Sequence, residues 1–360
     1  MTHTRTDLPR TSSPPQTRVA RLGSLRDVVA FFGALLVAFA LTAGLFAALG
    51  ANPWDAFRAI ATGAFGSSYS IRQTMYVATA LGFTAIAALL PFRAGILNVG
   101  GDGQFALGAI ASTAVIFSLG SAGAAVMISL AVIGGAVAGA LWSGLAGWLR
   151  VKAGANEVIV GLMLNFIAAL LADYVISGKW ADSLAPQTKN LPTTANFPSL
   201  PGVGGNYATG VLVAVVVILG IWLLIDRSRF GFKVRVVGSN PDAGRRAGIG
   251  FNRVVLAVML IGGACAGLGG VIQVTSVDHA LISNPAQSYG YTGIAVALLA
   301  GLRPILVIPA ALFFAALSVG ANSLPAVTGI STSASLIAQG IFVIGLLAAG
   351  VIRIKSAKES

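Results

Sequence analysis

The sequence predicts an all-α, polytopic membrane protein with about ten transmembrane helices. Of its 360 residues, 56% are hydrophobic and only 9% are charged, whereas soluble domains are about 25% charged. Long uncharged runs recur along the chain, and a helix needs roughly 20 mostly apolar residues to cross the hydrocarbon of a bilayer. The net charge of +12 does not indicate nucleic-acid binding, because the basic residues lie between the apolar runs and not on one patch.

Ten apolar runs are candidate spans. The first is uncharged and longer than the apolar core of a secretory signal, so we expect it to stay in the membrane. The expected spans are Val28–Leu49, Met75–Phe92, two within Gly103–Leu149 with a break near Gly120–Gly123, Val158–Ile176, Gly210–Ile225, Val254–Thr275, Tyr291–Leu302, Pro304–Ala321 and Ala334–Ile352. Dividing this series after the fifth span leaves two halves of odd number, which predicts halves that are inverted relative to each other.

The basic residues between the spans predict the orientation. If the N-terminus is cytoplasmic and the chain then alternates, all but four of the 23 Lys and Arg residues fall on the cytoplasmic side. The four expected outside are Arg58, Arg72, Lys179 and Lys189. Cytoplasmic loops carry the excess of Lys and Arg in membrane proteins, so we expect an N-in/C-in topology.

The segments around the spans differ in composition. Residues 1–26 are rich in Thr, Ser, Pro and Arg and are expected to form a disordered cytoplasmic tail, and residues 353–360 a short cytoplasmic C-terminal tail. Residues 27–352 form the expected transmembrane domain. Within it, the polar residues 177–207 are expected to be an external loop and the basic residues 226–253 a cytoplasmic segment.

Small residues are frequent in two of the spans, at Gly134–Gly147 and Gly262–Gly270. Helix association in lipid depends on close backbone approach, so these stretches predict helix packing. The single cysteine, Cys265, cannot form an internal disulfide and is expected to be a packing residue.

Residues 93–104 form the densest polar and glycine-rich cluster beside a span. Its glycines and polar side chains are Gly95, Gly100, Gly101, Gly103, Asn98, Asp102 and Gln104. The glycines oppose a continuous helix, and the polar side chains cannot face lipid without a large cost. We predict a broken or re-entrant segment buried in protein. Either it lines or gates a pathway, or it is a tight turn at the cytoplasmic end in which Asp102 caps the next helix.

A second polar set consists of Asn156, Glu157 and Asn165. Asn156 is suited to cap the following span, and Glu157 complements the positive end of its dipole. A role in a polar pathway is the alternative for both. Asn165 lies two turns deeper in the span, where capping does not account for it, so we expect it to face such a pathway.

The basic segment 226–253 contains a short predicted helix. Asn240 is a good N-cap, Pro241 suits the first helical position, and Gly248 is expected to end the helix. So short a helix is marginal alone in water and needs a surface to pack on. It is either a docking element for a cytosolic subunit or an orientation-setting basic loop against anionic lipid.

The sequence carries no motif for catalysis. It contains no GxxxxGK[ST], HExxH or CxxC, and its only histidines are His3 and His279. The carboxylates of Asp102, Glu157 and Asp173 all lie near span ends, whereas proton-coupled carriers usually need one deeper. We therefore expect the chain to have no catalytic activity and no cofactor or metal of its own, and a secondary carrier is a less favoured possibility.

Three motifs, in order, resemble ABC importer permeases of the branched-chain amino acid and simple-sugar superfamily. Phe92–Gln104 resembles the FRAGxxNIGxEGQ motif, with Asp102 in place of the usual Glu and Gly101 in place of Ala. Asn156–Asn165 is similar to the NEVI…MLN stretch of the nucleoside-importing branch, and Ser228–Ile249 to the coupling segment of that branch. The resemblance extends over most of the chain.

This resemblance implies a permease subunit in the bacterial cytoplasmic membrane that imports nucleosides, with simple sugars or another small polar solute as the alternative. Its implied partners are a second permease subunit, cytosolic ABC ATPase subunits that carry ATP–Mg, and an extracytoplasmic substrate-binding protein. The residues expected at a translocation path or gate are Asn98, Gly101, Asp102, Gln104, Asn156, Glu157 and Asn165. Those expected to couple to the ATPase are Arg235, Gly238, Asn240, Pro241, Ala243 and Gly248.

Overall fold

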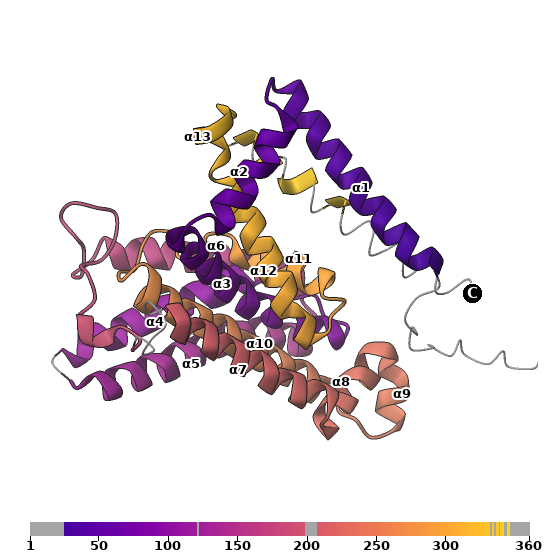
Figure 1. The fold of residues 1–360 in the computed structure, drawn as a ribbon. Coiled ribbons are helices and arrows are strands. Elements are labelled where there is room, and N and C mark those ends of the chain that lie inside the picture. Colours follow the sequence, from indigo (N-terminus) through magenta and orange to yellow (C-terminus); the bar gives the residue numbers. More distant parts are fainter. Residues whose placement is uncertain are drawn as a thin grey trace, which may run out of the picture.

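The computed structural model describes residues 25–120, 122–198, 207–331, 333–334, 336–337, 339–341 and 344–345. Over these residues the fold is α-helical (Figure 1). Two isolated β-bridges, Ala181–Thr188 and Gln187–Ile282, lie in the non-helical segments that follow Ile176 and Val277. The expected N-terminal tail up to residue 24, the C-terminal tail and most of the expected span Ala334–Ile352 lie outside the described residues.

Seven helices in the described part of the chain are long and apolar enough to cross a membrane. They are α3 (Ser68–Arg93), α4 (Gly101–Leu119), α5 (Ala124–Ala153), α6 (Glu157–Ile176), α7 (Tyr207–Asp226), α10 (Phe251–Ile272, continued by the π-helical turn η2, Gln273–Val277) and α12 (Pro304–Ala321). An eighth candidate is a bent span. It joins Leu36–Ala48, part of α1 (Leu25–Ala48), to α2 (Pro53–Phe65), and the two helices meet at an angle of 111°. The remaining elements are η1 (Thr193–Ala195), α8 (Arg229–Ser239), α9 (Pro241–Arg246), α11 (Tyr289–Leu299) and α13 (Leu324–Thr328).

Two expected spans have different bounds in the structure. Helix α3 begins at Ser68 and not at Met75, because Ser67 caps it through the backbone N–H of Ser70. Helix α11 has only 11 residues, fewer than the roughly 20 that a crossing needs. Left-handed backbone at Ser288 before this helix and at Gly301 after it confines the helix to that length.

The predicted small-residue packing is confirmed where α4, α5 and α10 meet. A Cβ added to Gly108 or Gly139 would overlap the backbone of Gly267, and one added to Gly263 would overlap the carbonyl oxygen of Gly139. The three backbones therefore touch directly, which gains the close van der Waals contact that drives helix association in lipid. Cys265 is 4% exposed within this region and is a packing residue, as predicted.

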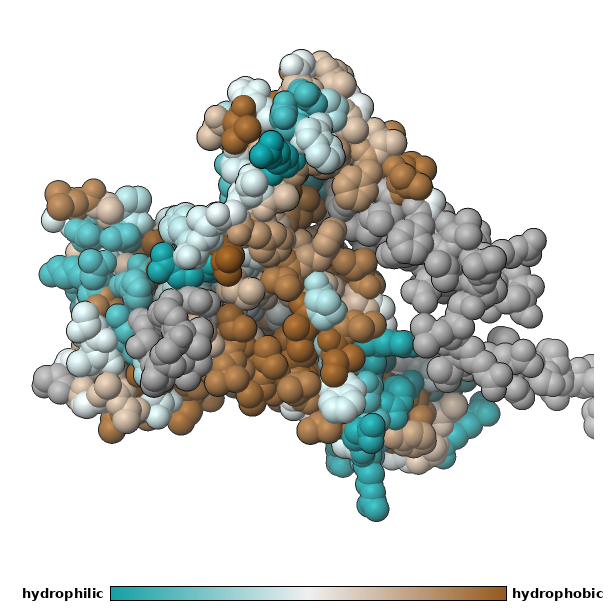
Figure 2. All heavy atoms as spheres, viewed as in Figure 1, coloured by the Kyte–Doolittle hydropathy of each residue, from teal (hydrophilic) through white to brown (hydrophobic). Residues whose placement is uncertain are grey.

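The pattern of burial is that of a multi-pass membrane protein. The central helices α3 and α10 are 72% and 67% buried over their most apolar windows, against 22% for α5 and 28% for α7. In Figure 2 apolar side chains cover the middle of the bundle, and hydrophilic side chains gather at the α8–α9 end and at the opposite end. A hydrophobic belt between two polar ends suits a chain whose solvent is lipid.

Candidate translocation and coupling sites

The predicted break at residues 93–104 is confirmed. Helix α3 ends at Arg93, Gly95 has a left-handed φ of 78°, and α4 begins at Gly101. Pro91 ends the regular α3 pattern, and its carbonyl oxygen accepts hydrogen bonds from the N–H groups of Ala94 and Ile96. The chain between Gly95 and Gly101 therefore leaves its backbone groups free to bind side chains from other helices. We call residues 93–104 the broken segment.

Two buried amide side chains hold the broken segment against α3. The Nδ2 of Asn98 donates to the carbonyl oxygen of Ala87 at 2.9 Å, and the Nε2 of Gln104 donates to the Oδ1 of Asn98 at 2.9 Å. The same Oδ1 accepts the backbone N–H of Gly100 at 3.1 Å. Asn98 is 3% exposed and Gln104 1% exposed. Because each of these buried polar groups has a hydrogen-bond partner, neither side chain carries the desolvation penalty of a buried group left without one.

Asn165 joins three elements from its place on α6. Its Oδ1 accepts the backbone N–H of Gly103 at 2.8 Å, and its Nδ2 donates to the carbonyl oxygen of Val99 at 3.0 Å and to the hydroxyl of Tyr291 at 3.0 Å. Asn165 is 7% exposed. The structure thus places this side chain in a buried network that ties α6 to the broken segment and to α11.

Asp102 caps a helix other than its own. Its Oδ1 accepts the backbone N–H of Gly290 at 2.6 Å, in the first turn of α11, where the carboxylate faces the positive end of the helix dipole. Capping of α4 by Asp102, one of the two alternatives for this segment, is wrong, because Gly100 occupies the N-cap position of α4 and this helix has no side-chain capping hydrogen bond. The close approach depends on small residues, since a Cβ on Gly101 would lie 3.1 Å from the Cα of Gly290.

Asn156 and Glu157 lie at the edge of this network. Asn156 caps α6 as predicted, and its Oδ1 accepts the N–H groups of Val158 and Ile159. Glu157 forms an ion pair with Arg150 at 3.3 Å and accepts the N–H of Leu97 at 3.5 Å. The helix-capping role of Asn156 is therefore confirmed, and a part in the pathway stays a prediction for both residues.

The structure brings five of the seven predicted path residues together. They are Asn98, Gly101, Asp102, Gln104 and Asn165. Sequence reasoning missed two residues that complete the site. Tyr291 had been assigned only as the first residue of a span, and Gly290 carries no signal that a partner on α4 would bind its N–H group. These fixed polar groups connect α3, α4, α6 and α11 at the broken segment.

The short helix predicted after Asn240 is confirmed as α9. The Oδ1 of Asn240 accepts the N–H groups of Asp242 and Ala243, and Pro241 occupies the first helical position. The helix ends one residue earlier than expected, with Ala247 at the cap, and Gly248 follows with a left-handed φ of 74°. The N–H groups of Gly248 and Ile249 then bond back to the carbonyl oxygens of Arg245 and Gly244, which is the Schellman arrangement.

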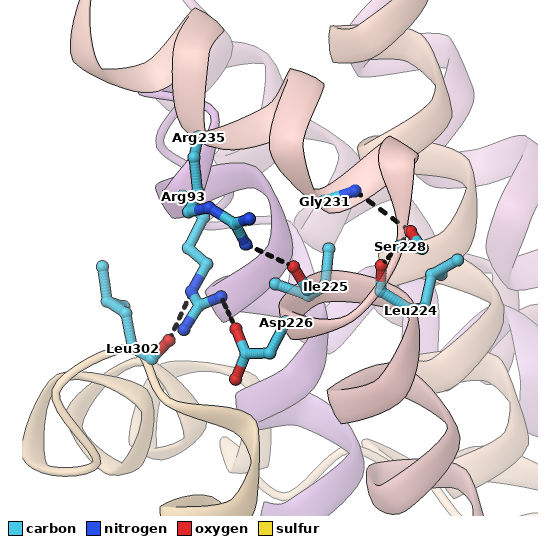
Figure 3. A network of polar contacts seen from close by, with 8 residues as sticks. All are labelled: Arg93, Leu224, Ile225, Asp226, Ser228, Gly231, Arg235 and Leu302. Atoms are coloured by element: carbon cyan, nitrogen blue, oxygen red, sulfur yellow. Dashed lines mark hydrogen bonds and ion pairs between the residues drawn. The ribbon is translucent and has the colours of Figure 1, made fainter.

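Helix α8 connects α9 to the membrane bundle, and sequence reasoning missed it. Ser228 caps it through the N–H groups of Phe230 and Gly231. Arg235 donates from Nη1 to the carbonyl oxygen of Ile225 at 2.6 Å (Figure 3). Gly238 lies directly on the carbonyl oxygen of Arg93, where a Cβ would overlap it. Two of the predicted coupling residues, Arg235 and Gly238, therefore attach α8 to α7 and α3.

These features define a polytopic, α-helical membrane protein with a broken segment at one end of the bundle and an exposed, capped helix beside it. Comparison with known proteins identifies the family. The family model described as branched-chain amino acid transport system / permease component matches residues 70–348, and the chain belongs to this family.

Individual relatives align over most of the chain. A glucose ABC transporter permease of Haloferax volcanii is 33% identical, over 87% of this chain and 85% of its own. A nucleoside ABC transporter permease of Lactococcus lactis is 32% identical, over 82% of this chain and 84% of its own. A guanosine ABC transporter permease of Bacillus subtilis is 29% identical, over 89% of this chain and 93% of its own.

Proposed function

We propose that this permease forms the membrane pathway of an ATP-driven importer of nucleosides. The observation that carries the substrate class is the full-length similarity to two permeases named for nucleoside and guanosine transport. The stretch Asn156–Asn165, which resembles the nucleoside branch, supports it. In this chain that stretch supplies both the cap of α6 and the side chain that binds the broken segment.

The proposed complex contains a second permease subunit, cytosolic ABC ATPase subunits and an extracytoplasmic substrate-binding protein. Helix α9 is the proposed docking element for the ATPase. It is preorganised by a cap at each end and lies at the polar end of the bundle. A short helix that packs little of its surface against its own chain has surface left for a partner.

The proposed topology is about ten membrane-inserted helices, of which α11 crosses only part of the bilayer, with both termini in the cytoplasm of a bacterial cell. The excess of Lys and Arg supports it, because α8, α9 and the turns after α3 and α5 would then share the cytoplasmic side. Arg93, Arg150 and Asp226 lie at the ends of α3, α5 and α7, where charged groups can reach the interface.

Simple-sugar import is the second candidate. It is favoured by the 33% identity to a glucose transporter permease over 87% of this chain. Both substrates present sugar hydroxyl groups, but a nucleoside carries a five-membered ribose ring and a base, whereas glucose is a six-carbon sugar without a base.

Uptake in cells tests the proposal. Cells that lack this gene are compared with cells in which it is restored, using labelled guanosine, cytidine and glucose, and a strain without the ATPase partner as the control. We expect nucleoside uptake to be lost on deletion and restored with the gene. Loss of glucose uptake alone would assign the sugar function, and unchanged uptake of all three solutes would exclude both.

A further inference from the structure

Arg93, the first residue of the broken segment, connects the ends of three helices. Arg93 is the last residue of α3, and its side chain is 14% exposed. Its Nη1 forms an ion pair with the Oδ1 of Asp226, at the end of α7, at 2.6 Å. Its Nε donates to the carbonyl oxygen of Leu302, in the turn between α11 and α12, at 2.6 Å (Figure 3). We call Arg93, Asp226 and Leu302 the Arg93 junction.

The backbone of the same arginine supports the cytoplasmic helices. Gly238 of α8 lies on the carbonyl oxygen of Arg93, and the Cα of Gly238 is 3.6 Å from the position that a Cβ on Gly95 would take. At its other end α8 lies on the last turn of α7, where Gly231 contacts the carbonyl oxygen of Ile225. Both ends of α8 therefore contact other helices. If a movement of α9 displaces α8, the ends of α3 and α7 must move with it.

The junction also reaches the broken segment by a second route. Leu302 has a left-handed φ of 55° and follows α11. The first turn of α11 is held by Asp102 and Tyr291 is held by Asn165. One path of contacts thus runs directly from Arg93 into the broken segment, and another runs through α11 to α4 and α6.

We propose that Arg93 and Asp226 are positioning residues that transmit the movement of the ATPase-docking helix α9 to the broken segment. This inference rests on the proposed ATP-driven function. A guanidinium is suited to the role because its fixed fork can bind a carboxylate and a carbonyl oxygen at once, whereas the point charge of a lysine cannot hold both in one geometry. Removal of one partner leaves the other charge partly buried and uncompensated, which weakens the connection between the helix ends.

The test uses the permease with its cognate ATPase and substrate-binding protein in proteoliposomes. The variants are Arg93→Gln, Asp226→Asn and their combination. The control is Arg253→Gln, which removes an exposed positive charge at the start of α10, where the described part of the chain shows no ion pair. We expect ATP hydrolysis to persist in the two single variants and the amount of nucleoside imported per ATP to fall on the order of tenfold. The double variant should lose no more than Arg93→Gln alone, because that variant already removes both the ion pair to Asp226 and the hydrogen bond to Leu302.

A distance measurement separates transmission from transport. Cysteines that replace Leu97, 50% exposed in the broken segment, and Leu141, 65% exposed on α5, are spin-labelled, while Cys265 is buried and does not compete. Addition of a non-hydrolysable ATP analogue should change this distance in the otherwise unaltered complex and in Arg253→Gln, but not in Arg93→Gln. A change that persists in Arg93→Gln, or no change in the otherwise unaltered complex, would overturn the proposal. If nucleosides are the wrong substrate, nucleoside uptake is absent in every variant. The distance change caused by the ATP analogue then still tests whether Arg93 transmits the movement.

Discussion

Substitution of Asn165 by Leu tests whether the buried network holds the broken segment in place. The change removes the hydrogen bonds to the Gly103 N–H, the Val99 carbonyl and the Tyr291 hydroxyl and leaves all three groups without that partner. Hydrogen bonds between membrane helices contribute about 0.6 to 2 kcal/mol each, so the expected loss of stability is about 2–5 kcal/mol. For a chain of 360 residues such a loss lowers Tm by roughly 3–7 °C.

The buried Cys265 provides the assay. A thiol-reactive fluorophore labels this cysteine only as the purified protein unfolds in detergent, so its signal against temperature reports Tm. Asn252→Leu is the matched control, because Asn252 is exposed at the start of α10 and its replacement should leave Tm within about 1 °C. An unchanged Tm in Asn165→Leu together with lost uptake would refute the structural role and assign Asn165 to the pathway.

Two further predictions concern packing and coupling. Gly267→Val places a side chain on the carbonyl oxygen of Gly135 and should prevent the close approach of α5 and α10. The detergent-solubilised variant should therefore aggregate, which size-exclusion chromatography detects. The control is Gly220→Val, where a Cβ meets nothing within 4 Å, and this variant should elute as the native protein does. Bulky residues at Asn240 and Gly248 remove the cap of α9, at about 1 kcal/mol, and force a side chain into left-handed backbone. These variants should insert into the membrane normally and lose ATP-coupled uptake, and uptake at the native rate would exclude α9 as the docking element.

Some of the site could be predicted because its signals are local. The caps formed by Asn240 and Asn156 depend on side chains that bond to N–H groups two and three residues away, so spacing alone indicated them. The break at residues 93–104 followed from its glycines. By contrast, the capping alternative for Asp102 assumes a partner in the helix that follows it, whereas its carboxylate binds Gly290, which is 188 residues distant in the chain. Nothing in the spacing of residues near Asp102 indicates that partner.

The sequence by itself determined the membrane class, most of the spans and the two capped helices, because hydrophobic run length and short-range hydrogen bonding are properties of neighbouring residues. It also indicated which stretches pack closely, since small residues are needed wherever helix backbones touch in lipid. Only the tertiary structure decided which glycines meet, that α11 is too short to cross a membrane, and that Arg93 joins Asp226 to Leu302. These contacts join residues far apart in the chain, and their partners are selected by how the helices pack.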